Sequence, residues 1–145
     1  MQRDEGGFDY SVVTKPAARE LRETAEQVRK IARISVLEVG KNLNRVKRLL
    51  PHGDFLQWAQ EECGLEPRIA QKMMKVAQVI KCENYSLLEI GQSALYAITE
   101  GTCPKEARAE ALELAANGSF VSYGLAKAII ERHKPKKDPK PPPRS

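Results

Sequence analysis

The side chains in this sequence that are best suited to chemistry lie between residues 68 and 75. Arg68, Gln71, Lys72 and Lys75 recur at three and four positions, which places them on one face of a helix. Arginine and glutamine match the base edges of guanine and adenine, whereas lysine suits phosphate. The pattern predicts base-edge contacts by Arg68 and Gln71 and phosphate contacts by Lys72 and Lys75, although a solvated helix face would give the same pattern.

Basic residues are also concentrated upstream, where residues 31–50 hold five basic residues against one acidic residue, a charge of +4. Lys41, Arg45 and Arg48 are three or four positions apart and are predicted to form a ridge on phosphates. The whole chain of 145 residues carries +5, and its Lys- and Pro-rich end adds further positive charge. Clustering of this kind indicates a polyanionic partner.

Catalytic and metal-binding patterns are not evident. Cys63, Cys82 and Cys103 are widely spaced and form no C-x-x-C pair, so we expect buried free thiols rather than a zinc site or disulfides. His52, in Pro-His-Gly, has no catalytic partner at a telling spacing and is expected in a turn. The sequence therefore predicts no enzyme, no metal and no cofactor.

The first half of the chain has a helical apolar period. The apolar stripe predicts one long helix over residues 14–50, capped by Thr14 and either crossed closely or divided at Gly40. A short helix capped by Asp54 should end at Gly64. A third helix should then run from Pro67 to about residue 81. Its expected inward positions are Ala70, Met73, Met74, Ala77 and Ile80, and its outward ones are Arg68, Gln71, Lys72, Lys75 and Gln78.

The second half is also predicted to be helical, over residues 93–100, 104–116 and 121–132, with Ser122 as the last cap. We therefore predict an all-α fold. It comprises a flexible arm (1–13), the long helix with a helix-turn-helix-like unit (14–82), a small C-terminal helical bundle (83–133) and a disordered basic tail (134–145). No apolar run is long enough to span a membrane, and the polar start is unlike a signal peptide, which predicts a protein of the bacterial cytoplasm or nucleoid.

Two short helices joined by a glycine turn are typical of a helix-turn-helix. Its small and apolar positions are filled by Ala59, Cys63, Gly64, Leu65, Ala70 and Met73. A helical hairpin that only packs a core would share this pattern. Trp58 is expected in the core between helices.

The segments LPHGDFLQW (50–58) and GLEPRIAQKMMKVA (64–77) resemble a bacterial family found in phages, plasmids and integrative elements, over about residues 8–80. Members share K-x-x-L-x-H-G-x-F-x-x-W followed by R-T-A-Q-R-Y-M, and this chain departs from that pattern at Ile69 and Met73. The C-terminal half loosely resembles the helical centre of ParB-type partition proteins, without their nucleotide-binding motifs. The resemblance implies a helical, DNA-associated module and does not name its target.

Together these observations predict a DNA-binding accessory protein of a mobile element, either a transcription regulator or a partition or maintenance factor, with double-stranded DNA as its partner. The alternative is a protein-interaction module, such as a phage-encoded inhibitor of a host protein. Homodimer formation stays open.

Overall fold

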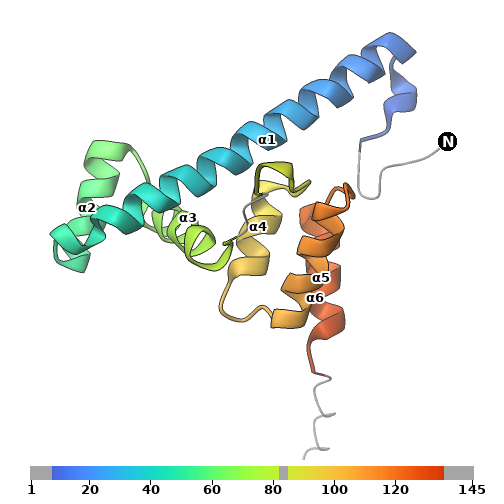
Figure 1. The fold of residues 1–145 in the computed structure, drawn as a ribbon. Helices are drawn as coiled ribbons and strands as arrows, with labels where there is room; N and C mark the ends of the chain where they lie inside the picture. The colour runs from blue at the N-terminus through green and yellow to red at the C-terminus, as the bar shows by residue number, and fades with distance from the viewer. Residues whose placement is uncertain (1–7, 82–84, 136–145) are drawn as a thin grey trace, which may run out of the picture.

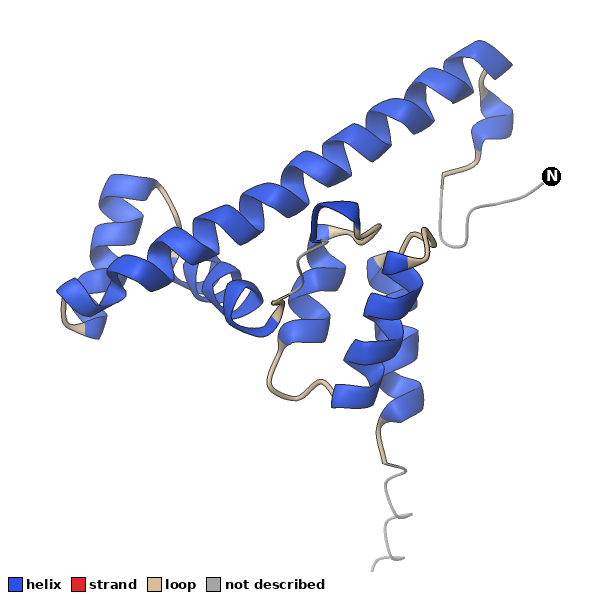
Figure 2. Ribbon diagram, in the orientation of Figure 1, coloured by secondary structure: helices blue, strands red, loops and turns tan. Residues whose placement is uncertain are grey.

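The structure is a computed structural model that describes residues 8–81 and 85–135. Within these residues the chain forms helices and 3-10 turns, with a single β-bridge between Ile90 and Val121 (Figure 1, Figure 2). The predicted all-α class is confirmed. The α-helices are α1 (Lys15–Val46), α2 (His52–Cys63), α3 (Pro67–Val79), α4 (Gln92–Thr99), α5 (Lys105–Ala116) and α6 (Tyr123–His133); the 3-10 turns are η1 (Tyr10–Val12), η2 (Lys47–Leu49) and η3 (Tyr85–Leu87).

Helix α1 begins as predicted, because the Thr14 hydroxyl accepts a hydrogen bond from the Ala17 N–H at 3.3 Å. The helix stays continuous through Gly40, where α3 crosses it closely, so the first of the two alternatives at this glycine is the correct one. It ends at Val46, and η2 replaces the last predicted turn. Figure 1 shows the N-terminal half of α1 extending beyond the other helices, while its C-terminal half lies along α3.

Helices α2 and α3 are joined by a short glycine turn, as predicted. Gly64 has a φ of 69° and ends α2 in the left-handed conformation, and Pro67 lies in the first turn of α3. The predicted role of Asp54 as an N-cap is wrong. Helix α2 already begins at His52, since the Pro51 carbonyl accepts a hydrogen bond from the Phe55 N–H at 2.8 Å. Asp54 lies instead in the first turn, where its negative charge interacts favourably with the positive end of the helix dipole.

The apolar residues gather in two clusters, and α1 and α3 contribute to both. The smaller cluster joins α1, α2 and α3 through Leu43, Phe55, Ala59, Ala70 and Met74. Trp58 packs against it, half-buried, with its ring centroid 5.9 Å from that of Phe55, in agreement with the predicted core role.

The larger cluster extends from α1 and α3 into the C-terminal helices. It joins Val36 and Val76 to Leu95, Ala111 and Ile129, which lie on α1, α3, α4, α5 and α6 in turn. Its members therefore come from both sides of the boundary expected at residue 83. Helix α6 begins after Ser122, whose hydroxyl accepts a hydrogen bond from the Leu125 N–H at 3.1 Å, as predicted. The ends of α4, α5 and α6 differ from the predicted ones by at most two residues.

Of the predicted buried thiols, Cys103 is buried and Cys63 is exposed on the last turn of α2, so the prediction for Cys63 is wrong. The helical period placed Cys63 near the apolar side, but this side chain lines an open pocket between α1 and the end of α2 instead of the core. Cys82, the start of the predicted arm (1–7) and most of the predicted tail (136–145) lie outside the described residues. Among the described helices, none is both long and apolar enough to cross a bilayer.

Candidate nucleic-acid interface

One face of α3 is open to solvent. Arg68, Gln71, Lys75 and Gln78 are all exposed, and their spacing of three and four residues aligns them in one row. The opposite positions Ala70, Met74 and Ile80 are buried, as predicted. Helix α3 is thus held by its inner face and presents a polar row outward.

Lys72 departs from the predicted outward set, because it is only half-exposed. Its ammonium nitrogen lies 5.4 Å from the ring centroid of Tyr96 on α4. This distance is within the range of a cation–π contact. This contact could not be predicted from the sequence, because it depends on α4 packing beside α3.

On one side of the polar row lies a groove of about 410 Å³ where α3 meets the end of α1 and the start of α2. Gln71 and Lys75 line it from α3, and Lys47 and His52 line it from the other wall. Gln78, which also lines the groove, connects α3 to α1, because its amide donates a hydrogen bond to the Asn44 side chain at 2.9 Å. The groove therefore adds Lys47, which the sequence did not single out, to two of the predicted residues.

On the other side of the row, α3 borders a polar pocket of about 270 Å³ shared with α4 and α6. Arg68 and Lys72 line it from α3, and Lys127 and Lys134 line it from α6 and its end. Neither Lys127 nor Lys134 was predicted as a site residue, since no spacing in the sequence relates them to α3. The four predicted residues of α3 are thus divided between two hollows that flank the same exposed row.

The residues of the predicted ridge on α1 and η2 have different surroundings. Lys41, Arg45 and Arg48 are all exposed. Arg45 donates a hydrogen bond from its guanidinium to the Asn42 side chain at 2.9 Å. It rims a separate apolar pocket of about 320 Å³ with Trp58. Arg33, which contributed to the charge of this segment, is 1% exposed and adds no surface charge.

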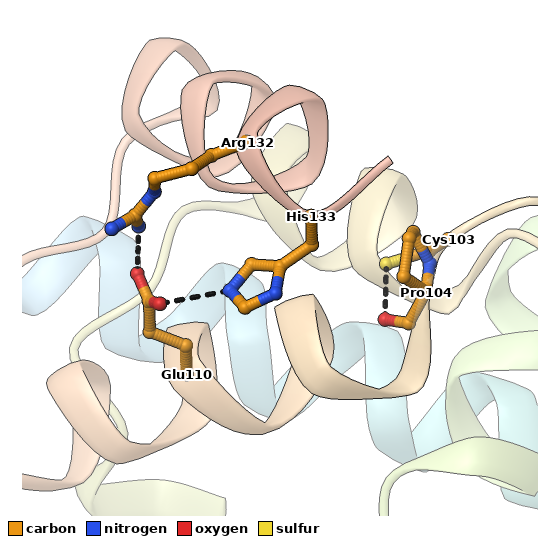
Figure 3. Close-up of polar contacts among 5 residues, drawn as sticks. All are labelled: Cys103, Pro104, Glu110, Arg132 and His133. Carbon is orange, nitrogen blue, oxygen red and sulfur yellow. Dashed lines mark hydrogen bonds and ion pairs between the residues drawn. The ribbon is translucent and has the colours of Figure 1, made fainter. Parts of the chain in front are cut away.

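Four cations on and beside α3 take part in none of the salt bridges of the described residues. Throughout residues 8–81 and 85–135, the salt bridges involve other residues than Arg68, Lys72, Lys75 and Lys127. Acidic groups are paired elsewhere: Glu110 on α5 is held by Arg132 and His133 of α6 (Figure 3). Hydrogen bonding from His133 and then from Arg132 lowers the pKa of Glu110.

The Cys103 thiol and the His133 imidazole are each directed at another group. The Cys103 thiol donates a weak hydrogen bond to the Pro104 carbonyl, with 3.4 Å between the sulfur and the oxygen. Figure 3 shows the His133 ring directed at Glu110 instead, with 2.9 Å between its Nε2 and a carboxylate oxygen. Burial raises the pKa of the Cys103 thiol, which disfavours the nucleophilic thiolate.

Comparison with known families gives one match. Residues 13–94 match the family described as "Protein of unknown function (DUF3102)". This match spans more than half of the chain, including α1, α2, α3 and the start of α4, and the chain belongs to that family. No curated protein and no solved structure matches it.

Proposed function

We propose that this DUF3102 protein is a DNA-binding accessory protein that acts through α3 as the second helix of a helix-turn-helix. The observation that carries the proposal is the exposed row of α3, with a cation-lined hollow on either side of it and no acidic partner for its cations in the described structure. A helix that enters the major groove needs polar side chains at its tip and cations toward both flanking phosphate strands.

The positions of the individual side chains suggest different roles. Arg68 and Gln71 are exposed in the first half of α3, where a recognition helix contacts base edges. Lys75 and Lys47 share a groove on one side and would meet one phosphate strand. Lys72 is drawn back over Tyr96, which suits a contact with phosphate more than one with a base.

A place in a phage, plasmid or integrative element, as a transcription regulator or a partition or maintenance factor, is also part of this proposal. It is supported by the resemblance of residues 50–58 and 64–77 to proteins of such elements. Genes for an integrase, replication or partition next to this gene would add support.

Selection of bound fragments from a random DNA pool at about 150 mM salt tests the proposal, since non-specific phosphate binding is already weakened there. We expect Gln71→Ala to weaken the binding free energy for the selected site by about 1–3 kcal/mol and to change the affinity for random DNA little. Lys75→Ala should weaken binding to all sequences and lower the salt slope by about 0.9. Gln27→Ala and Lys105→Ala, at exposed positions distant from α3 in sequence, are matched controls.

The role of α3 would be refuted by a quadruple variant that stays folded and binds the selected DNA as before. This variant combines Arg68→Ala, Gln71→Ala, Lys72→Ala and Lys75→Ala. An enrichment that yields no preferred sequence would refute base readout and leave only phosphate binding.

The alternative of a protein-interaction module is favoured by a different observation. Leu21, Val28 and Ile31 are 45%, 59% and 65% exposed on the projecting half of α1. Large apolar side chains at such spacing on one helix are typical of a surface covered by another protein. Tight binding to one host protein that persists at high salt, together with no DNA selection, would favour this function.

A further inference from the structure

The polar pocket between α3, α4 and α6, which shares Arg68 with the exposed row of α3, has the features of a small-molecule site. Its volume is about 270 Å³, just below the value of about 300 Å³ at which the usual range of ligand pockets begins. Its walls come from segments far apart in the sequence: Arg68 and Lys72 from α3, Tyr96 from α4, and Lys127 from α6. Such convergence of polar groups on one hollow is the usual arrangement of a binding site.

The charge of this pocket is strongly positive. Four cationic side chains line it, and Glu100 is the single carboxylate in its lining. Lys134 is partly neutralised by Glu131, with 3.1 Å between the ammonium and a carboxylate oxygen. The Cys103 thiol in the wall stays neutral because burial raises its pKa. The excess of positive charge calls for an anion with more than one negative charge.

Two of the lysines are held in place by aromatic rings. The Lys72 ammonium lies 5.4 Å from the Tyr96 ring centroid, and that of Lys127 lies 6.0 Å from the Tyr123 ring centroid. Both tyrosines line the same pocket. Cation–π contacts restrict the two flexible side chains and so reduce the entropy that an incoming anion must remove.

The remaining polar groups of the wall suit the rest of a ligand. Ser93 and Thr102 bring hydroxyls, and Glu100 brings a hydrogen-bond acceptor. A bare inorganic anion would leave these groups unused and would be repelled by the carboxylate. A ligand that carries its own hydroxyl donors next to a phosphate would use both parts of the wall.

We propose that this pocket binds a small phosphate monoester that carries hydroxyl groups, of the sugar-phosphate or nucleoside-monophosphate class. Arg68, Lys72 and Lys127 receive the phosphate, and Glu100 accepts a hydrogen bond from a ligand hydroxyl. The proposal does not require DNA binding, although an occupied pocket would cover Arg68 and Lys72 and so compete with DNA phosphates.

Isothermal titration of the full chain with ribose 5-phosphate and with adenosine monophosphate tests this, at about 150 mM ionic strength, where weak surface charge effects are screened. Sulfate and inorganic phosphate serve as ligand controls. We expect saturable 1:1 binding of at least one ester, weakened about tenfold or more by Lys72→Gln or Lys127→Gln, as for the loss of one charge-assisted contact. Lys127→Arg should retain most of the affinity.

Lys105→Gln is the matched control, because it removes the same charge from an exposed position outside the pocket. The proposal would be overturned if neither ester binds, or if Lys105→Gln weakens ester binding as much as Lys72→Gln and Lys127→Gln do. Equal affinity for sulfate or inorganic phosphate would overturn the assignment to a hydroxylated ester. If Lys127→Gln weakens only binding to duplex DNA, the pocket holds backbone phosphates and the small-ligand proposal is wrong. Circular dichroism of each variant verifies that it is folded.

Discussion

Gly40 of α1 lies directly against the peptide carbonyl of Met73 in α3. A Cβ added to Gly40 would overlap that carbonyl and would lie 2.9 Å from the Cβ of Ala77. Neither obstacle is the end of a flexible side chain, so the two helix backbones would have to separate. The crossing matters because α1 and α3 contribute to both apolar clusters.

Gly40→Ala should therefore destabilise the protein, even though alanine favours a helix by about 1 kcal/mol over glycine. We expect a net loss of about 1–3 kcal/mol in the free energy of unfolding, as for overpacked cores. Urea unfolding followed by circular dichroism measures it. Gly53→Ala is the control, since no atom lies within 4 Å of its added Cβ. A Gly40→Ala protein as stable as Gly53→Ala would contradict the close crossing.

Tyr85 and Arg33 join η3 to α1 by two reciprocal hydrogen bonds. The Tyr85 hydroxyl donates to the Arg33 carbonyl at 2.6 Å, and the Arg33 Nε–H donates to the Tyr85 carbonyl at 3.2 Å. Both residues are buried. Tyr85→Phe should lower the free energy of unfolding by about 1–3 kcal/mol, because it removes the donor of a buried hydrogen bond. Tyr123→Phe, at an exposed ring, should change the free energy of unfolding by no more than about 0.5 kcal/mol in the same urea unfolding assay.

The same tyrosine predicts a loss of stability in alkali. Burial raises the pKa of Tyr85 well above its usual range. In the unfolded chain it ionises near pH 10, so stability is unaffected below about pH 10 and falls as the pH rises beyond it. Titration of tyrosinate absorbance should show one tyrosine that ionises only as the helical signal is lost. Retention of that late step in Tyr85→Phe would assign it to another residue.

The features of the fold that could be predicted are those with partners close in sequence. The Thr14 and Ser122 caps each bond an N–H three residues on, and Gly64 adopts its left-handed φ within the turn itself. The helical period also placed Ala70 and Met74 in the core. Asp54 shows the limit of such signals. It was predicted to precede α2, but α2 begins directly after Pro51 and already contains Asp54.

The surroundings of the candidate site could be predicted less well, since they depend on packing between distant segments. Lys47 and Lys127 reach the two sides of α3 only because α1 and α6 lie beside it. Arg45 has the right type and spacing for the predicted ridge, and only the structure shows that it bonds to Asn42 and borders the apolar pocket beside Trp58. A count of charge along the chain does not distinguish these cases.

Glu110 should make the stability of the C-terminal helices dependent on acid. Hydrogen bonds from His133 and Arg132 lower its pKa in the folded protein. A lowered pKa stabilises the fold at pH values above the ordinary glutamate value, about 4.3, and this contribution is lost as the pH falls through the folded value. Glu110→Gln should therefore have a lower Tm than the parent at neutral pH, and the difference should shrink below about pH 4.3.

Glu113→Gln is the matched control for that series, because Glu113 is exposed on the same helix and takes part in no salt bridge of the described structure. Its Tm should follow that of the parent over the whole range. A Glu110→Gln difference that stays constant between neutral and acid pH would show that the ion pair contributes nothing to stability.

Lys47 and Arg45 offer the sharpest test of the proposed DNA interface, because they are neighbours in sequence with different surroundings. Lys47 lines the groove that Gln71 and Lys75 share, whereas Arg45 rims the apolar pocket beside Trp58. If DNA lies along α3, Lys47→Ala should reduce the salt slope of its affinity by about 0.9, the value for one phosphate contact. Arg45→Ala removes the same charge and should leave that slope unchanged. Fluorescence anisotropy with a labelled duplex over a series of salt concentrations measures both, and equal slopes for the two variants would mean that DNA responds only to net charge and not to the groove beside α3.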